Sequence, residues 1–179
     1  MRQLLLSILF LLYAQSFACS CAPVKLSERI KFRNRNIQTS EEVFIADVFA
    51  IDTINYTYKL KVKEVFKGAF VKGEVIKGSF LSTCEPYVSI EGTWLLFGDF
   101  SDDEFRSKDC GYSKSFEFPW YNALLAPKPD PEGLFGEELV EFQEKEWCNF
   151  QNIATINLSE DIEYLRSIKA TLGSGNVRD

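Results

Sequence analysis

The sequence contains no histidine. Without an imidazole the chain cannot form Ser-His-Asp or Cys-His nucleophilic sites, or a zinc site with histidine ligands. Acidic residues gather in three short runs, at residues 101–104, 130–132 and 144–146. Runs of this kind are typical of solvated loops and helix faces, and Asp102, Asp103 and Glu104 in the first run lack the alternating ligand spacing of a calcium loop. We therefore expect a protein that is not an enzyme and holds no cofactor or metal of its own.

A basic excess is also lacking, because 26 acidic residues outnumber 20 lysines and arginines and give a formal net charge of −6. An acidic chain offers little positive charge to displace the counterions of a phosphate backbone. The composition therefore argues against nucleic acid and anionic membrane surfaces as partners. After residue 13 no second long apolar run follows, so no transmembrane segment is expected in the rest of the chain.

The one long apolar run, at residues 4–13, is typical of a secretory signal peptide. A basic residue precedes it, and the run is too short to span a bilayer comfortably. The small residues Ser16 and Ala18 then occupy positions −3 and −1 of a cleavage site. We therefore predict a signal peptide at residues 1–18. The mature protein would begin at Cys19 and be secreted, extracellular or in the cell envelope.

Five cysteines in a secreted chain indicate disulfide bonds, and they are Cys19, Cys21, Cys84, Cys110 and Cys148. Because the number is odd, at least one is free, modified or in an intermolecular bridge. Cys148 lies on a predicted helix, where we expect a buried free thiol or an intermolecular bridge. Asn55 and Asn157 fit the glycosylation sequon, which matters only in a eukaryotic source.

Residues 43–66 predict a long β-hairpin, because two runs rich in β-branched and aromatic residues flank the short loop "INY". In the second run the apolar residues alternate with lysines. We expect one set to face the core (Tyr58, Leu60, Val62 and Val65) and the other to face water (Lys59, Lys61 and Lys63).

Three further strands are predicted, at residues 74–80, in "GTWLLFGDF" and in "CGYSKSFEF". The segment "SDDEFRSKD" is predicted to be an acidic, solvated loop. Five strands within residues 43–118 predict a small closed or partly open barrel. A short helix is expected within residues 22–36. After a proline-rich break at residues 126–133, two helices, at residues 134–147 and 159–173, are expected to cover the barrel, the second with Ser159 as N-cap.

The chain resembles the tissue inhibitors of metalloproteinases and the wider netrin-like (NTR) domain family. The matching features are the mature start "CSCAP", the hairpin, "STCEP", "GTWLLFG" and "CGYSKSFEFPWYNAL". The resemblance covers about residues 19–125 and implies a mainly β fold with flanking helices, built on a five-stranded OB-like (NTR) barrel. Residues 126–179 would form a C-terminal helical extension packed on it. The resemblance also implies the disulfides Cys19–Cys84 and Cys21–Cys110.

An inhibitory site follows from the same resemblance. The α-amine and carbonyl of Cys19 would chelate the zinc of a partner metalloendopeptidase and replace its water; an α-amine with a pKa of ~7.7–8.0 is partly neutral at physiological pH. The hairpin tip at residues 52–57 would add contacts. The residues expected to contact the protease are Ser20, which would enter its specificity pocket, Cys21, Ser82, Thr83, Cys84 and Glu85.

The sequence also departs from the animal inhibitors. Their cysteine-rich C-terminal subdomain is replaced by predicted helices, and a third disulfide is missing because no cysteine lies between Cys21 and Cys84. The alternative is therefore a non-inhibitory secreted or lipid-anchored NTR interaction module. If a lipoprotein signal peptidase cleaved before Cys19, acylation would block the amine that the inhibitory mechanism needs.

Overall fold

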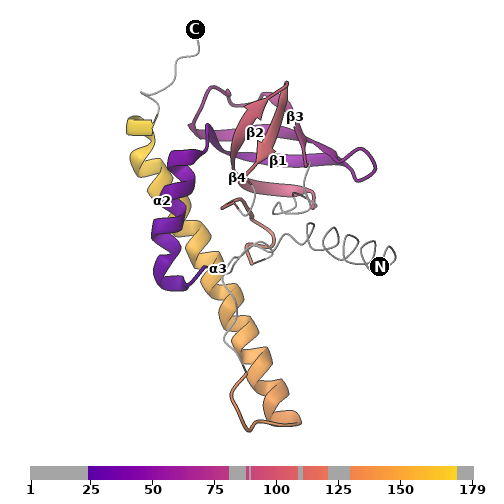
Figure 1. Cartoon of the computed structure of the whole chain (residues 1–179), viewed down its shortest axis with the longest axis vertical. Coiled ribbons are helices and arrows are strands. Elements are labelled where there is room, and N and C mark those ends of the chain that lie inside the picture. Colours follow the sequence, from indigo (N-terminus) through magenta and orange to yellow (C-terminus); the bar gives the residue numbers. More distant parts are fainter. Residues whose placement is uncertain (1–23, 81–87, 89, 109–110, 121–129, 173–179) are drawn as a thin grey trace, which may run out of the picture.

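The computed structural model describes residues 24–80, 88, 90–108, 111–120 and 130–172 (Figure 1). A 3-10 turn, η2 (Leu26–Glu28), leads into helix α2 (Arg29–Thr39), and the long helix α3 (Glu137–Leu172) follows the strands. The strands are β1 (Glu42–Asp52), β2 (Thr57–Lys67), β3 (Val75–Ser79), β4 (Gly92–Ser101), β5 (Glu104–Ser107) and β6 (Lys114–Ser115).

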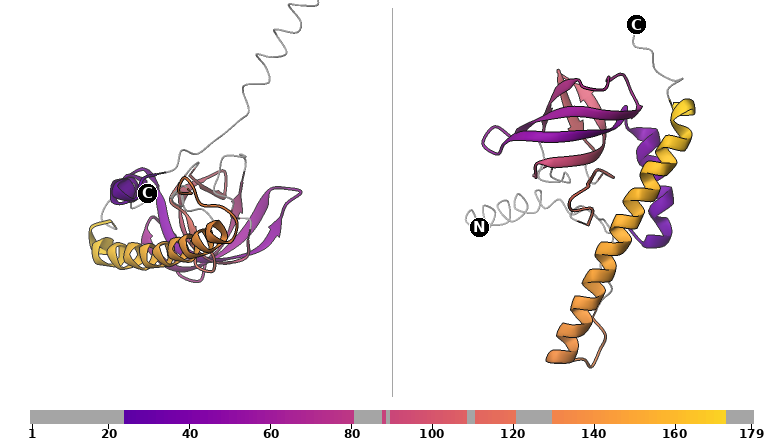
Figure 2. Two further views of the ribbon diagram at one scale, coloured as in Figure 1. Left: turned by 90° about the horizontal axis from the view of Figure 1, so that it is seen from below. Right: turned by 180° about the vertical axis from the view of Figure 1, so that it is seen from behind.

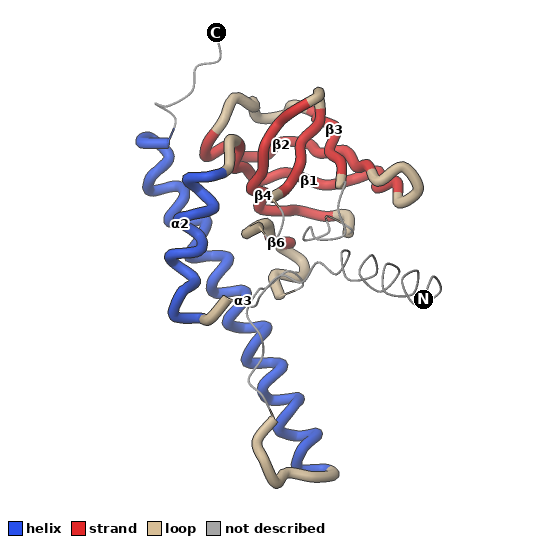
Figure 3. The backbone as a smooth tube through the Cα atoms, in the orientation of Figure 1, coloured by secondary structure: helices blue, strands red, loops and turns tan. Residues whose placement is uncertain are grey.

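Five of these strands close into a barrel, in the order β1-β2-β3-β5-β4 with β4 pairing back onto β1. The β3–β5 pair is parallel and the other pairs are antiparallel. The short strand β6 adds to β4 outside this ring (Figure 3). The predicted class, mainly β with flanking helices, is confirmed, and the closed five-stranded barrel is compatible with an OB-like fold.

The predicted hairpin is also confirmed, as β1 and β2 joined by residues 53–56. On β2 the core-facing Tyr58, Leu60 and Val62 are at most 2% exposed. Lys59, Lys61 and Lys63 are exposed, as the alternation predicted. Because side chains on a strand alternate between its two faces, the lysines take the outer surface of the barrel.

Strands β1 and β4 are buried on both faces, which explains their nearly continuous apolar sequence. One face of each strand lines the barrel interior, through Phe44, Ala46, Trp94 and Leu96 among others. The opposite face forms a second core with α2 and α3, built from Val43, Ile45, Leu95, Phe97, Ile37, Leu158, Ile162 and Leu165 among others. The helices are therefore bound to the barrel by apolar burial.

The prediction of the fifth strand was wrong. The closing strand is β5, which lies in the segment expected to be a solvated loop. In the described part of "CGYSKSFEF", residues 111–118, only residues 114–115 form a strand. Asp102 and Asp103 both have positive φ, 54° and 62°, and make the two-residue turn between β4 and β5. Such a turn matches the twist of the strands on either side. It brings Phe105 into the barrel core, where it is fully buried.

The prediction of two C-terminal helices was also wrong, because α3 runs without a break from Glu137 to Leu172. Ser159, the expected N-cap, lies exposed within it. No glycine or proline occurs in those 36 residues, so nothing in the sequence ends the first helix. Only the second half of α3 covers the barrel; the first half projects away from it (Figures 1 and 2).

Candidate functional site

The residues predicted to contact a protease lie outside the described residues, as do both predicted disulfides. They are Cys19, Ser20, Cys21, Ser82, Thr83, Cys84, Glu85 and Cys110. The structure does describe the hairpin tip and the residues on both sides of the segment 81–87. We call this set the hairpin edge, and it consists of residues 50–58, Phe80, Val88, Ile90 and Glu91.

The hairpin tip is a turn held by one carboxylate. Asp52 accepts hydrogen bonds from the backbone N–H groups of Ile54 and Asn55, at 2.9 and 3.0 Å, and from Asn55 Nδ2 at 2.7 Å. The backbone and side-chain hydrogen bonds from Asn55 lower the pKa of Asp52, so the carboxylate stays charged near neutral pH. Ile54 is 85% exposed and Tyr56 is 57% exposed. The tip therefore presents apolar side chains on an ordered turn.

Two residues near the tip, Ala50 and Tyr56, have left-handed backbone conformations, with φ of 52° and 54°. Such conformations in residues other than glycine cost free energy and persist where surrounding contacts hold them. The Ala50 N–H donates to Glu91 Oε1 at 2.9 Å. The Tyr56 carbonyl accepts from the N–H of Phe80 at 3.0 Å. Both strained residues thus bond to the residues that flank the segment 81–87.

Aromatic contacts fix the same flanking residues. The Phe80 ring packs edge-on against Tyr56, with centroids 5.6 Å apart, and stacks on Tyr58 at 6.0 Å. On the other side, Val88 is buried in the barrel core, and the carbonyl of Ile90 accepts from Trp94 Nε1 at 2.9 Å. The residues that bracket the predicted protease contacts are therefore held by the hairpin on one side and by the barrel core and Trp94 on the other.

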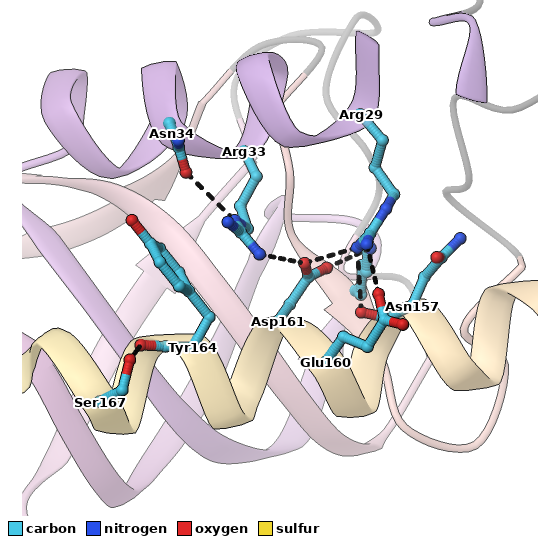
Figure 4. A network of polar contacts seen from close by, with 9 residues as sticks. Arg29, Arg33, Asn34, Asn157, Glu160, Asp161, Tyr164 and Ser167 are labelled. Atoms are coloured by element: carbon cyan, nitrogen blue, oxygen red, sulfur yellow. Dashed lines mark hydrogen bonds and ion pairs between the residues drawn. The ribbon is translucent and has the colours of Figure 1, made fainter. Parts of the chain in front are cut away.

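A second group of interest joins the two helices, and we call it the ion cluster. It consists of Arg29, Arg33, Glu160 and Asp161 (Figure 4), together with Lys114 of β6. Asp161 Oδ1 accepts from Arg29 Nη1 at 2.7 Å and from Arg33 Nη1 at 3.3 Å. Asp161 Oδ2 accepts from Lys114 Nζ at 2.8 Å. Arg29 Nη2 also bonds the half-exposed Glu160 at 2.5 Å. One fully buried carboxylate on α3 thus binds two arginines of α2 and a lysine of β6.

Burial and charge oppose one another in this cluster. Burial acts to lower the pKa of Arg29, but Asp161, Tyr112 and Glu160 raise it overall, so the guanidinium stays charged. Burial lowers the pKa of Lys114, and Asp161 opposes that shift. The guanidinium of Arg33 also lies 3.7 Å from the centroid of the Tyr164 ring, a cation–π contact. The cluster fixes the orientation of α2, which begins ten residues after Cys19.

Sequence reasoning missed the ion cluster. Arg29 and Asp161 are separated by 132 residues, and neither lies in a recognisable motif. The sequence predicted a short helix within residues 22–36 but did not indicate which of its residues are buried; in the structure Arg29 is buried and Ile30 is exposed. The high proportion of arginine on this short helix could have indicated buried ion pairs, but the sequence does not identify the partner carboxylate.

Three remaining predictions concern Cys148 and the two sequons. Cys148 is a free cysteine and is exposed on α3, so the expectation of a buried thiol is wrong, while an intermolecular bridge stays a prediction. Asn55 lies in the exposed hairpin tip. Asn157 is buried within α3, and its carbonyl accepts from Arg29 Nη1 at 3.3 Å. A glycan needs a surface position, so Asn157 is not a site in the folded protein.

Within the described residues, no helix is long and apolar enough to cross a membrane, and no three histidine, cysteine, aspartate or glutamate side chains are placed to hold a metal ion. A scan against protein-family models finds no match to this chain, and a search of curated proteins finds no significant match. The resemblance to the metalloproteinase inhibitors therefore stays a prediction from the residues.

Proposed function

We propose that this protein is a secreted inhibitor of zinc metalloendopeptidases that acts through the mature N-terminus at Cys19. The α-amine and carbonyl of Cys19 bind the protease zinc in place of its water, and Ser20 enters the specificity pocket. Residues 82–85 and the hairpin tip contact the protease on either side of the active site. The zinc belongs to the protease; this chain supplies only the two ligand atoms.

The observation that supports this proposal is the construction of the hairpin edge. The described residues on both sides of the segment 81–87 are bonded to the hairpin through Tyr56 and Ala50. A surface that is ordered before binding loses less conformational entropy when it binds. The two proposed disulfides, Cys19–Cys84 and Cys21–Cys110, would tie the N-terminus to this prepared surface.

The first experiment is an intact-mass and N-terminal analysis of the protein secreted by its native host. The proposal expects Cys19 as the first residue, with a free amine and with its sulfur in a disulfide. The mature protein is then titrated against a panel of zinc endopeptidases, and inhibition is expected against at least one of them.

The matched control carries one additional alanine before Cys19, which moves the amine away from the zinc and is expected to abolish inhibition. A second variant, Ile54→Ser, tests the hairpin tip and is expected to weaken inhibition without removing it. The proposal is wrong if the wild-type protein inhibits none of the proteases, or if the extended protein inhibits equally well.

The second candidate is a non-inhibitory interaction module, either secreted or anchored by lipid at Cys19. The projecting first half of α3 favours this alternative, because it exposes Val140 and Trp147 away from the hairpin edge. An acylated Cys19 in the intact-mass measurement would support this candidate and exclude the inhibitory one.

A further inference from the structure

The first half of α3, residues 137–153, forms a helical arm that extends beyond the barrel and α2 (Figures 1 and 2). The whole helix has 36 residues and is therefore about 54 Å long. Helices that do not pack against a body are only marginally stable in water. A projecting arm of this kind gains stability when its apolar side is covered.

The apolar line that binds the second half of α3 to the body continues onto the arm. Positions seven residues apart lie nearly in line on a helix, and here they are Val140, Trp147, Ala154 and Asp161. Ala154 and Asp161 are buried against the body, whereas Val140 is 54% exposed and Trp147 is 46% exposed. The Trp147 ring also contacts Phe150, with centroids 5.6 Å apart. The arm therefore presents the same face as the docked half of the helix, with two of its large side chains still exposed.

Acidic residues border this exposed face. The arm carries one lysine, Lys145, and five glutamates: Glu137, Glu138, Glu141, Glu144 and Glu146. Glu137 and Glu144 are three residues before and four residues after Val140, so both flank it on the helix surface. A second copy of the arm would bring glutamates against glutamates, and an anionic membrane would be repelled in the same way. The charge favours an occupant rich in lysine and arginine.

The molecule already contains one such pairing, between α2 and the second half of α3. Four of the first seven residues of α2 are basic: Arg29, Lys31, Arg33 and Arg35. Arg29 pairs with Glu160 and Asp161, and Arg33 pairs with Asp161 while lying on the ring of Tyr164. Apolar contacts accompany the ion pairs, because Ile37 of α2 enters the same core as Leu158 and Ile162. α2 thus shows which kind of helix binds to α3.

We propose that the arm is a docking site for a basic, amphipathic helical segment of a partner protein. Apolar side chains of that segment cover Val140 and Trp147, and its lysines and arginines pair with Glu137, Glu141 and Glu144. The site is separate from the hairpin edge and does not depend on protease inhibition.

The test uses the mature full-length chain and a fluorescent synthetic peptide with the sequence of residues 24–39, "VKLSERIKFRNRNIQT". Fluorescence anisotropy is expected to show saturable binding that weakens as salt is raised, since screening reduces the charge attraction. A peptide with every arginine and lysine replaced by glutamate is expected not to bind.

Two variants of the chain locate the binding site. The double variant Val140→Ser/Trp147→Ser is expected to weaken peptide binding at least tenfold, and Glu137→Gln/Glu144→Gln at least fivefold. Ile156→Ser is the matched control, because Ile156 is exposed on the opposite side of the same helix, and it is expected to change binding less than twofold. Thermal unfolding checks that all three remain folded, as expected for exposed positions.

Three results would overturn the proposal. The first is that the basic peptide does not bind the wild-type chain, and the second is that it binds Val140→Ser/Trp147→Ser as tightly as the wild type. The third is self-association in sedimentation that the same double variant abolishes, which would make a second copy the occupant of the arm.

Discussion

Among single residues, Asp161 has the most demanding environment. Its carboxylate is fully buried and binds three cationic groups, each on a side chain that is itself less than one-tenth exposed. Removing a charged group from water costs several kcal/mol, and only its partners offset that cost. The arrangement therefore makes the contact between α2 and α3 specific: a shifted helix would leave buried cations without their carboxylate.

We expect Asp161→Ala to destabilise the protein by about 3–5 kcal/mol, because the substitution leaves three buried cations without their shared partner. Urea denaturation followed by circular dichroism measures the loss. Glu160→Gln is the matched control and is expected to cost less than about 1 kcal/mol, because its side chain is half exposed. Equal losses in the two variants would contradict this assignment.

Contacts of this kind lay beyond sequence reasoning for a physical reason. Periodicity reports which side of an element is apolar, and it gives no reason to expect a buried arginine at position 29. Burial of arginine depends on a carboxylate 132 residues away, and only the folded chain brings the two together.

At the scale of elements, the prediction succeeded where a single local pattern decides the structure. Alternation on β2 and the continuous apolar run of β4 fixed both strands and their buried faces. It failed for β5, because four residues with one fully buried side chain, Phe105, resemble an acidic loop when read alone. It also failed at Ser159, because a good N-cap residue does not start a helix where the preceding residues are already helical.

The β4–β5 turn offers a test at this scale. Asp103 has φ of 62°, a conformation that glycine adopts without penalty, so Asp103→Gly is expected to stabilise the protein by about 1 kcal/mol. Chemical denaturation measures the change. The matched control is Asp103→Ala, which removes the same carboxylate but keeps a Cβ and is expected to give no gain. A gain in the alanine variant would show that charge, and not backbone conformation, controls this turn.

The contact between α3 and β2 offers a test of pH dependence. Arg166 donates to both oxygens of Glu64, at 3.1 and 2.7 Å, and this hydrogen-bonded pair lowers the pKa of Glu64 below its ordinary value of 4.5. The stabilisation is therefore fully present above pH 4.5 and is lost as the pH falls through the lowered pKa. Between pH 6 and pH 3 the free energy of unfolding of the wild type is expected to fall by up to about 1 kcal/mol more than that of Glu64→Gln. The effect is small because both groups are partly exposed. Equal losses in urea denaturation at the two pH values would count against the pair.

At the scale of the whole molecule, the chain forms two cores on opposite faces of β1 and β4. The barrel interior is built from the strands and the segments that join them, whereas the outer core needs the second half of α3. Stability is therefore expected to differ along this one helix. The fold class followed from the sequence, since strand patterns are local. The predicted contacts at residues 19–21 and 82–85 lie outside the described residues and therefore stay predictions.

Hydrogen exchange measured by NMR should reveal this difference within α3. Amides of residues 140–150 are expected to exchange at least about tenfold faster than those of residues 158–168, which pack in the outer core. Uniform protection along the helix would contradict the division into an arm and a docked half. Leu165→Ala is expected to accelerate exchange in both halves, because it removes a fully buried side chain from the outer core.

An unbroken helix also fixes distances. Trp147 lies eleven residues before Leu158, which places it about 16 Å along the helix axis from the point where α3 enters the outer core. Without a glycine or proline hinge between them, that spacing and its direction are set by backbone geometry. Any molecule bound at Trp147 is therefore held by α3 at a fixed distance from the barrel.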